Sequence, residues 1–449
     1  MRGIVNQDLN ERLQSPSVNA SIARFYKKND ILEVTGAVRG DFFDDDNLWY
    51  TLDNGAFVWN GAVDVEPECN TPDPEDKEQF VISYRRVLSD GSADMFIKDP
   101  ANELHFTPLK LPAKEATLQF NKLIPTHFAD GVIQSVKKLK DQNRRHVVVY
   151  IHGFQPFSSL KLDLLTSYAN NYMNFPGNKI AKVLFLVWPA QGLGRKRADD
   201  RAVLAGRNFT RNELFKPFEV LSQELRKEGM FLDLVVHSFG HQLLNGMLNP
   251  FDSLKLPKDV FENIFLMASD VTHLALNEKG FDLPNFFGRN DRFMYDYTQL
   301  KRLGRKVHVF FDEFDYLLYV STKKFVGADR LAERPLERDR RGLTDNYRNL
   351  GNYGIGELKD IFKPQLGFNV QSVQTLIAPN DIANLCDFPW QPYETTSFFR
   401  RHIDNVALTA DYGGFGLLDI VFNARRLQNY HKYVFTCRPV VRKVQSLLI

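Results

Sequence analysis

Cysteine is scarce in this chain. Cys69, Cys386 and Cys437 are the three cysteines among 449 residues, and they lie far apart in the sequence. An odd, scattered set of this kind does not form a disulfide framework and does not have the spacing of a zinc site. The sequence therefore predicts a protein of a reducing compartment, and we expect it in the cytoplasm.

Long apolar runs are also missing. A helix that crosses a bilayer needs about 18–20 consecutive apolar residues. The longest apolar runs, residues 147–151 and 183–189, have only the length of strands. The N-terminal sequence MRGIVNQDLNERLQ lacks the apolar segment of a secretory signal. We expect neither a transmembrane segment nor export.

No charge of one sign is in excess. The 57 Lys and Arg residues balance 55 Asp and Glu residues, which leaves a net charge of +2. A nucleic-acid-binding protein needs a concentrated basic surface to displace counterions from phosphates, so we expect no nucleic-acid partner. A dinucleotide-binding glycine fingerprint and a P-loop are both missing, and no cofactor is expected. The hydrophobic content of 43% excludes general disorder.

The first 66 residues have the pattern of a small all-β domain. Short β-prone runs at residues 31–34, 49–52 and 57–59 are separated by turn signals, among them Asn54-Gly55. Asn-Gly between apolar runs is a strong indication of a hairpin, and short strands with regular turns form a small barrel or sandwich. Residues 67–79 (EPECNTPDPEDKE) are rich in proline and acidic residues, so we place a linker there.

Several stretches of residues 1–66 resemble the bacterial SH3-like family. They are LNERLQSPS at residues 9–17, KKNDILEV at 27–34, the Trp49-Tyr50 pair and NGAFVW at 54–59. Arg12 stands at the position of that family's signature arginine. The resemblance implies an SH3-like barrel that binds peptide or cell-wall ligands. Because no export signal is present, we expect a protein or peptide ligand, or a contact within the chain.

From residue 80 to residue 449 the pattern changes to alternating helices and strands. The strands are continuously apolar, which is typical of a sheet covered on both faces, and helical crossovers predict a mostly parallel, doubly wound α/β sheet. The predicted helices are residues 128–139, 160–174, 211–228 and a segment that ends at residue 248. The predicted strands are residues 146–151, 182–188, 232–238, 263–269, 306–311 and 372–378.

A serine stands where one of these strands turns into a helix, within residues 232–248 (LDLVVHSFGHQLLNGML). Ser238 would lie on a tight turn above the sheet, at a helix N-terminus whose free N–H groups favour a developing anion. Such a serine is either a nucleophile or an ordinary helix N-cap. Gly240 provides room for the turn. Val236 disfavours a nucleophile turn at Ser238, because a small residue is usual two positions before the serine.

Histidines stand beside two strand-end turns, the turn at Ser238 and one earlier in the chain. An earlier strand ends in His152-Gly153, and in α/β-hydrolases the corresponding turn supplies a backbone N–H to the oxyanion hole. We expect His152 to organise that loop rather than to act as a base. His237 and His241 have the spacing of a helical metal pair, but no Glu lies between them and His237 belongs to the strand. No metal site is expected.

Three consecutive strand ends resemble an uncharacterised bacterial α/β-hydrolase family. They are YIHGF at residues 150–154, FLVWPAQG at 185–192 and LVVHSFG at 234–240. Members of that family have HGY-like, SWPS-like and HSMG-like motifs in this order and at similar spacing; Ala190 departs from the common Ser. The resemblance covers residues 80–430. It implies an α/β-hydrolase fold that cleaves an ester, thioester or amide.

The resemblance also implies a catalytic triad in the chain order serine, acid, histidine. Asp315 matches the position of the family's acid, and Asp270 at the preceding strand end is the alternative. The histidine is His402 or His431, which follow the last predicted strand, and we favour His402. Asp312 and Glu313, which lie close to Asp315, are further alternatives for the acid of the triad.

Two functions are compatible with these patterns. In a serine hydrolase, Ser238 would attack a carbonyl, His402 would act as base and then acid, and Asp315 would hold the histidine tautomer. The backbone amides of Phe154 and Phe239 would bind the oxyanion. We expect a small-molecule ester as substrate, with a lipid or acyl ester favoured over a peptide. The alternative is a non-catalytic hydrolase fold that serves as a sensor or scaffold.

The predicted hydrolase domain is longer than a minimal fold of this class. We expect its surplus in residues 80–125, 190–215, 271–300 and 322–370. These segments would build a lid or a surface for a partner.

Overall fold

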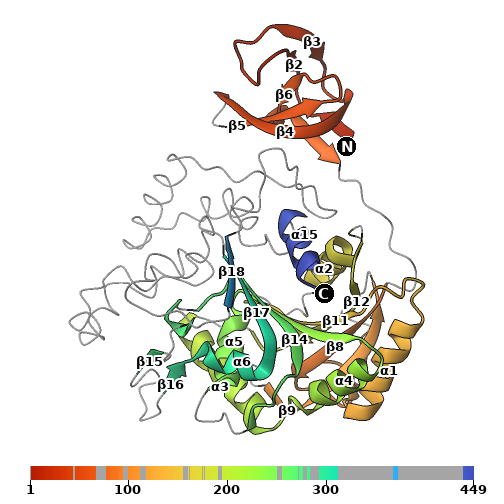
Figure 1. Cartoon of the computed structure of the whole chain (residues 1–449), viewed down its shortest axis with the longest axis vertical. Coiled ribbons are helices and arrows are strands. Elements are labelled where there is room, and N and C mark those ends of the chain that lie inside the picture. The colour runs from red at the N-terminus through yellow and green to blue at the C-terminus, as the bar shows by residue number, and fades with distance from the viewer. Residues whose placement is uncertain are drawn as a thin grey trace, which may run out of the picture. The chain divides into compact units, whose positions relative to one another are not determined.

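The computed structural model (Figure 1) describes residues 2–43, 46–66, 77–94, 100–111, 118–154, 160, 162–173, 175, 177–190, 195–249, 255–271, 273–276, 281–283, 293–311, 368–372 and 438–448. Contacts divide the chain into two units, Met1–Thr71 with Gln374–Leu447 and Pro72–Val373 with Leu448–Ile449. In the described parts, no helix has both the length and the apolar character that crossing a membrane requires.

The first unit contains a seven-stranded sheet with the order β3-β2-β6-β5-β4-β1-β7. All paired neighbours in it are antiparallel. Its strands are β1 (Arg2–Val5), β2 (Leu9–Arg12), β3 (Ile22–Tyr26), β4 (Ile31–Phe43), β5 (Asp46–Leu52), β6 (Phe57–Trp59) and β7 (Val63–Glu66). Helix α15 (Arg438–Leu447) also belongs to this unit.

The hairpin predicted at Asn54-Gly55 is confirmed. It joins β5 to β6, and Gly55 has a φ of 77°, which a glycine adopts without steric cost. Trp49 and Trp59 lie opposite each other on these strands and are both buried. An all-antiparallel sheet of this size is compatible with the predicted small β domain, and its SH3-like identity stays a prediction.

The second unit contains a nine-stranded sheet with the order β10-β9-β8-β12-β11-β13-β14-β17-β18 (Figure 1). The neighbours from β8 to β18 are parallel, and β9 and β10 add an antiparallel edge. Its strands are β8 (Glu78–Arg85), β9 (Pro100–Lys110), β10 (Asn121–Lys122), β11 (His146–Ile151), β12 (Ile180–Val187), β13 (Phe231–His237), β14 (Phe261–Met267), β17 (Gly304–Phe311) and β18 (Phe368–Ser372). A separate hairpin pairs β15 (Phe281–Leu283) with β16 (Phe293–Tyr295).

Helices cover both faces of this sheet, as the apolar strands predict. They are α1 (Pro125–Lys137), α2 (Leu162–Tyr168), α3 (Arg195–Arg211), α4 (Lys216–Lys227), α5 (Gly240–Met247) and α6 (Leu300–Leu303). We call the face under α1, α3, α4 and α5 the first face; α2 lies on the second face (Figure 1). Because both faces are covered, every residue of β11 and β12 is buried.

Two stretches predicted as surplus instead contribute to the core of this unit. Residues 80–125 contain most of β8 and all of β9 and β10, which extend the sheet beyond β12. Residues 190–215 contain all of α3. The N-terminal turns of α3 are strongly charged, but Ala202, Val203 and Phe209 are buried on the first face. A few apolar residues at helical spacing are enough to bury one side of a helix. In this stretch their periodicity is not evident from the sequence, because most of the neighbouring residues are charged.

Other segments match their predicted type with shifted ends. The predicted helix 160–174 is α2 followed by a π-helical turn at Ala169–Met173. Of the last predicted strand, residues 372–378, the structure describes only Ser372, at the end of β18, and residues 373–378 lie outside the described ranges, so this strand stays a prediction. Helix and strand ends are the least well determined part of such patterns, because tertiary contacts decide where the last hydrogen bond forms.

The order of the strands reverses at β11. Strand β11 has β12 on one side and β13 on the other, so the chain runs in opposite directions away from β11. In open α/β sheets, ligands bind at the carboxyl ends of the strands where the order reverses in this way. The turns after β11 and β13 therefore mark the edge at which a site is expected.

Candidate active site

The turn between β13 and α5 holds Ser238 in a left-handed conformation. Strand β13 ends at His237, α5 begins at Gly240, and Ser238 has a φ of 54°. A residue with a Cβ atom adopts this conformation at a cost of about 1–2 kcal/mol. Strain of this kind persists only where surrounding contacts enforce it, and it gathers at functional sites.

Backbone hydrogen bonds enforce the turn from two sides. The amide N–H of Ser238 donates to the carbonyl of Met267, at the end of β14, over 3.0 Å. The carbonyl of Ser238 accepts from the amide of His241 at 3.0 Å and from the amide of Asp270 at 3.4 Å. The turn is thus tied both to its own helix and to the end of the neighbouring strand.

Two glycines allow the turns after β11 and β13 to touch. A Cβ atom on Gly153 would lie 2.7 Å from the Cβ of Ser238, and one on Gly240 would lie 2.8 Å from the carbonyl oxygen of His152. Both distances are shorter than real Cβ contacts, so a larger residue at either position would force the turns apart. The glycines predicted to serve these turns are needed for close approach.

Neither structural concern about Ser238 applies. Val236 points into the buried core of the first face, in line with Leu234, so its bulk lies away from the turn. The N-cap residue of α5 is Phe239, and its side chain makes no capping hydrogen bond. Ser238 stands one residue before this cap, in a left-handed conformation and not in the extended conformation that is usual for a capping serine.

The two residues predicted to form the oxyanion hole lie beside each other. The rings of Phe154 and Phe239 meet edge to face with centroids 5.5 Å apart, and Trp188 stacks on Phe239 at 5.9 Å. Phe239 is buried, whereas the side chain of Phe154 is 42% exposed. An apolar ring is thus presented to solvent next to the turn of Ser238, which is itself 7% exposed.

His152 organises the loop after β11, in agreement with the expectation for it. Its Nδ1 lies 2.7 Å from the carbonyl oxygen of Gly153, which only accepts, so this nitrogen has the proton. The amide of Trp188 donates to Nε2 at 3.5 Å, and the Trp188 indole donates to the His152 carbonyl at 3.0 Å. Nδ1 thus closes the loop locally, while Nε2 and the His152 carbonyl connect it to Trp188 after β12.

Of the candidate acids and bases, only Asp270 lies within the described residues. Asp270 is buried at the end of β14, and its backbone carbonyl accepts from the Gln242 side chain at 2.6 Å. Asp315, His402 and His431 lie outside the described ranges, so the choice among them stays a prediction. Within those ranges, no three His, Cys, Asp or Glu side chains are arranged to hold a metal ion.

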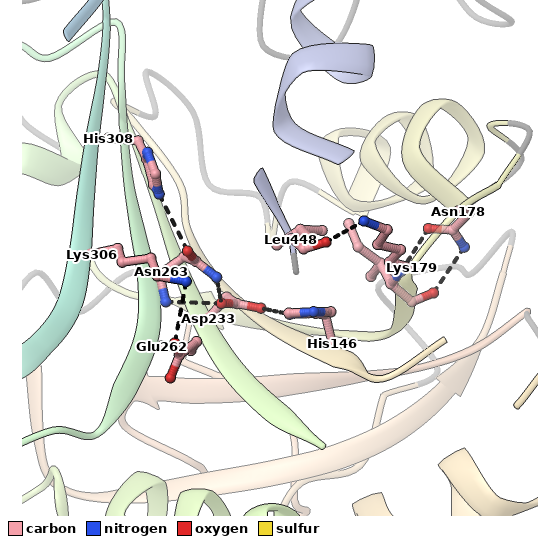
Figure 2. Close-up of polar contacts among 10 residues, drawn as sticks. His146, Asn178, Lys179, Asp233, Glu262, Asn263, Lys306, His308 and Leu448 are labelled. Atoms are coloured by element: carbon pink, nitrogen blue, oxygen red, sulfur yellow. Dashed lines mark hydrogen bonds and ion pairs between the residues drawn. The ribbon is translucent and has the colours of Figure 1, made fainter. Parts of the chain in front are cut away.

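A second polar cluster lies on the second face, toward the N-terminal ends of the strands (Figure 2). The Oδ2 of Asp233 lies 2.6 Å from Nδ1 of His146, and its Oδ1 accepts from the backbone and side-chain amides of Asn263 at 3.0 and 2.7 Å. The Oδ1 of Asn263 lies 3.2 Å from Nε2 of His308. Each of these four side chains is 5% exposed or less.

This cluster of His146, Asp233, Asn263 and His308 links four adjacent strands, β11, β13, β14 and β17. Buried polar groups are tolerated when their hydrogen bonds are made, and the carboxyl group of Asp233 has partners on both oxygens. The sequence did not predict this cluster. The signal was a buried polar residue in each of these four strands, and it cannot be interpreted until the strand order is known.

Two tyrosines of the second face are held neutral. Burial raises the pKa of Tyr150 well above its ordinary value of 10, and the neighbouring Tyr172 adds to the effect. Burial likewise raises the pKa of Tyr168, with smaller contributions from Tyr172, Tyr150 and Asp233. The rings of Tyr150 and Tyr168 pack 5.1 Å apart between β11 and α2. At neutral pH their uncharged rings pack between β11 and α2.

Comparison with known families gives one match. Residues 131–345 are similar to a family described as an alpha/beta hydrolase of unknown function (DUF900). The matched stretch contains β11 to β17 and both turns of the candidate site. A search of curated proteins finds no match. The match supports an α/β-hydrolase fold for the second unit, with a sheet that is mixed and mostly parallel.

Proposed function

We propose that the chain is a serine hydrolase and that Ser238 is its nucleophile. The observation that supports this most strongly is the strained turn of Ser238 at the carboxyl edge of the sheet, pressed against Gly153 of the neighbouring turn. A nucleophilic serine in this fold stands on such a turn, so that its hydroxyl projects above the sheet. The similarity to an alpha/beta hydrolase family supports the same reaction class.

The proposed reaction proceeds in two steps. The Ser238 hydroxyl attacks the ester carbonyl while a histidine, His402 in our proposal, takes its proton and is oriented by Asp315. The amides of Phe154 and Phe239 donate to the oxyanion of the tetrahedral intermediate. The histidine then gives the proton to the departing alcohol. A water molecule, activated by the same histidine, releases the acid and restores the serine.

The surroundings of Ser238 favour an ester with an apolar acyl group. Phe154 exposes its ring beside the turn, and Phe239 and Trp188 continue the aromatic surface beneath it. Sites for small molecules are lined mainly by apolar and aromatic side chains with few polar groups. We therefore favour a lipid or other acyl ester over a peptide.

Covalent labelling with a fluorophosphonate probe tests the proposal. We expect the wild-type chain to be labelled and Ser238→Ala to lose labelling completely, because the probe reacts only with an activated serine. Ser222→Ala is the matched control, since Ser222 is a buried serine on α4 and its loss should leave labelling intact. If the folded wild-type chain is not labelled, the alternative of a non-catalytic sensor or scaffold gains the support.

A further inference from the structure

His241 contacts the backbone of Ser238 through its ring. It stands in the first turn of α5 and is fully buried. Its Nδ1 lies 2.8 Å from the carbonyl oxygen of Ser238, and its Nε2 lies 2.9 Å from the hydroxyl of Ser269. This side chain adds a bond to a carbonyl that already accepts from two backbone amides.

These two contacts fix the protonation of the ring. A carbonyl oxygen only accepts hydrogen bonds, so Nδ1 of His241 has the proton. In the neutral ring Nε2 then accepts, and the hydroxyl of Ser269 donates to it. His241 is therefore a donor aimed at the Ser238 carbonyl, and the hydroxyl of Ser269 is compatible with this tautomer because it can donate to Nε2.

The position of Ser269 depends on a second left-handed turn. Strand β14 ends at Met267, and the next residue, Ala268, has a φ of 46°. This turn brings Ser269 under the ring of His241 and the amide of Asp270 to the Ser238 carbonyl. Two strained residues on adjacent strand ends thus converge on one peptide group, which indicates that its orientation matters.

That peptide group joins Ser238 to Phe239. A trans peptide is planar, and its C=O and N–H point in opposite directions. A donor that holds the Ser238 carbonyl on one side therefore fixes the direction of the Phe239 N–H on the other side. Accepting a hydrogen bond at the carbonyl also polarises the peptide and strengthens its N–H as a donor.

We propose that His241 is a positioning residue that aims the Phe239 amide at the oxyanion. The inference rests on the proposed serine hydrolase function, in which the Phe239 N–H is an oxyanion donor. His241 itself touches neither substrate nor reacting atoms. Without its ring hydrogen bond, the Ser238 carbonyl is held by two backbone amides alone, so the Ser238–Phe239 peptide tilts more easily and its amide donates less well when negative charge develops.

Two amide substitutions separate the contacts of the ring. The side-chain nitrogen of Asn can take the place of Nδ1, so His241→Asn keeps a donor to the Ser238 carbonyl and loses the contact with Ser269. The amide of Gln reaches the place of Nε2, so His241→Gln keeps the contact with Ser269 and loses the hydrogen bond to the Ser238 carbonyl. The measured quantity is the rate constant of fluorophosphonate labelling in the full chain, together with the melting temperature.

We expect His241→Gln to react about 10- to 100-fold more slowly than wild type, since an oxyanion donor is typically worth 10²–10³ in turnover and is only misaligned here. His241→Asn should react at close to the wild-type rate, although both variants are destabilised. Equal slowing in both variants, no slowing in either, or slowing in His241→Asn alone overturns the proposal. An unlabelled wild type would instead overturn the hydrolase function, so the two failures are distinct.

Discussion

The central strands of the large sheet are built differently at their two ends. At the carboxyl ends of β13 and β14, the turns contain left-handed Ser238 and Ala268, and a glycine lets the neighbouring turn come into contact. Toward the amino ends, Asp233 and Asn263 share hydrogen bonds with histidines across four strands (Figure 2). The backbone is strained at the carboxyl ends, whereas the buried polar groups toward the amino ends have hydrogen-bond partners.

From this difference we expect the carboxyl ends to govern reactivity and the amino ends to govern stability. Strained backbone is retained only where neighbours enforce it, and at the carboxyl edge those neighbours are hydrogen bonds that converge on Ser238. A satisfied buried network holds its strands in one register but offers no group for chemistry. Substitutions at the amino ends should therefore change stability most, and substitutions at the carboxyl ends should change reactivity most.

Removal of Asp233 should have the largest effect on stability. In Asp233→Ala, the backbone and side-chain amides of Asn263 and the ring of His146 lose their buried acceptor. Since each unsatisfied buried group costs roughly 1–3 kcal/mol, we expect the free energy of unfolding to fall by about 3–5 kcal/mol. Urea unfolding measures this change. Glu228→Ala, which removes an exposed pair with Lys137, should change it by less than about 1 kcal/mol.

If Asp233→Ala unfolds at the same urea concentration as Glu228→Ala, the cluster does not stabilise the sheet. The contrast between the two ends would then disappear.

A smaller effect is expected where α3 crosses α5, the helix that follows the Ser238 turn. A Cβ atom on Gly206 would lie 2.0 Å from the carbonyl oxygen of Leu243. Overpacking of this kind costs about 1–3 kcal/mol, so Gly206→Ala should unfold at lower urea and label more slowly as α5 is displaced. Gly131 on α1 faces open space, and Gly131→Ala should stabilise by about 0.5–1 kcal/mol. Equal effects of the two alanines would show that the crossing is not tight.

The smallest effect concerns the strain at Ser238 itself. Both Ser238→Ala and Ser238→Gly remove the hydroxyl, but only glycine adopts a φ of 54° without steric cost. We expect the glycine variant to be more stable than the alanine variant by about 1 kcal/mol. At Ser222, within α4, we expect the opposite order: Ser222→Ala should be more stable than Ser222→Gly by about 1 kcal/mol, because alanine is the better helix former. A comparison of the four unfolding free energies decides whether the turn stores strain.

Features that depend on local pattern could be predicted from the sequence. The strand at residues 146–151 was predicted with the bounds of β11, because a parallel strand buried on both faces is continuously apolar. The positions of Ser238 and Gly153 at strand ends were predicted because a local succession of apolar strand and turn residues can be read without knowledge of the neighbouring strands. The helix α3 was missed because its charged turns outweigh its buried face.

Features that depend on which strands become neighbours could not be predicted. Asp233 lies 87 residues from His146, and Asn263 lies 45 residues from His308. His241 was considered only as a metal ligand, because its link to Ser269 needs the end of β14 to lie beside the Ser238 turn. Long-range pairs of this kind follow from topology, and sequence spacing does not reveal them.

The placement of β8 next to β12 has a consequence for how the second unit folds. Gln79 on β8 accepts a hydrogen bond from the amide of Val183 on β12, a partner 104 residues later in the chain. Closing so long a loop is entropically unfavourable, and sheets built on distant pairs form slowly. Strands β8 and β9 are synthesised before β12, so β8 has no parallel neighbour until β12 is made. We expect this pair to be the segment that most needs a chaperone until the sheet closes.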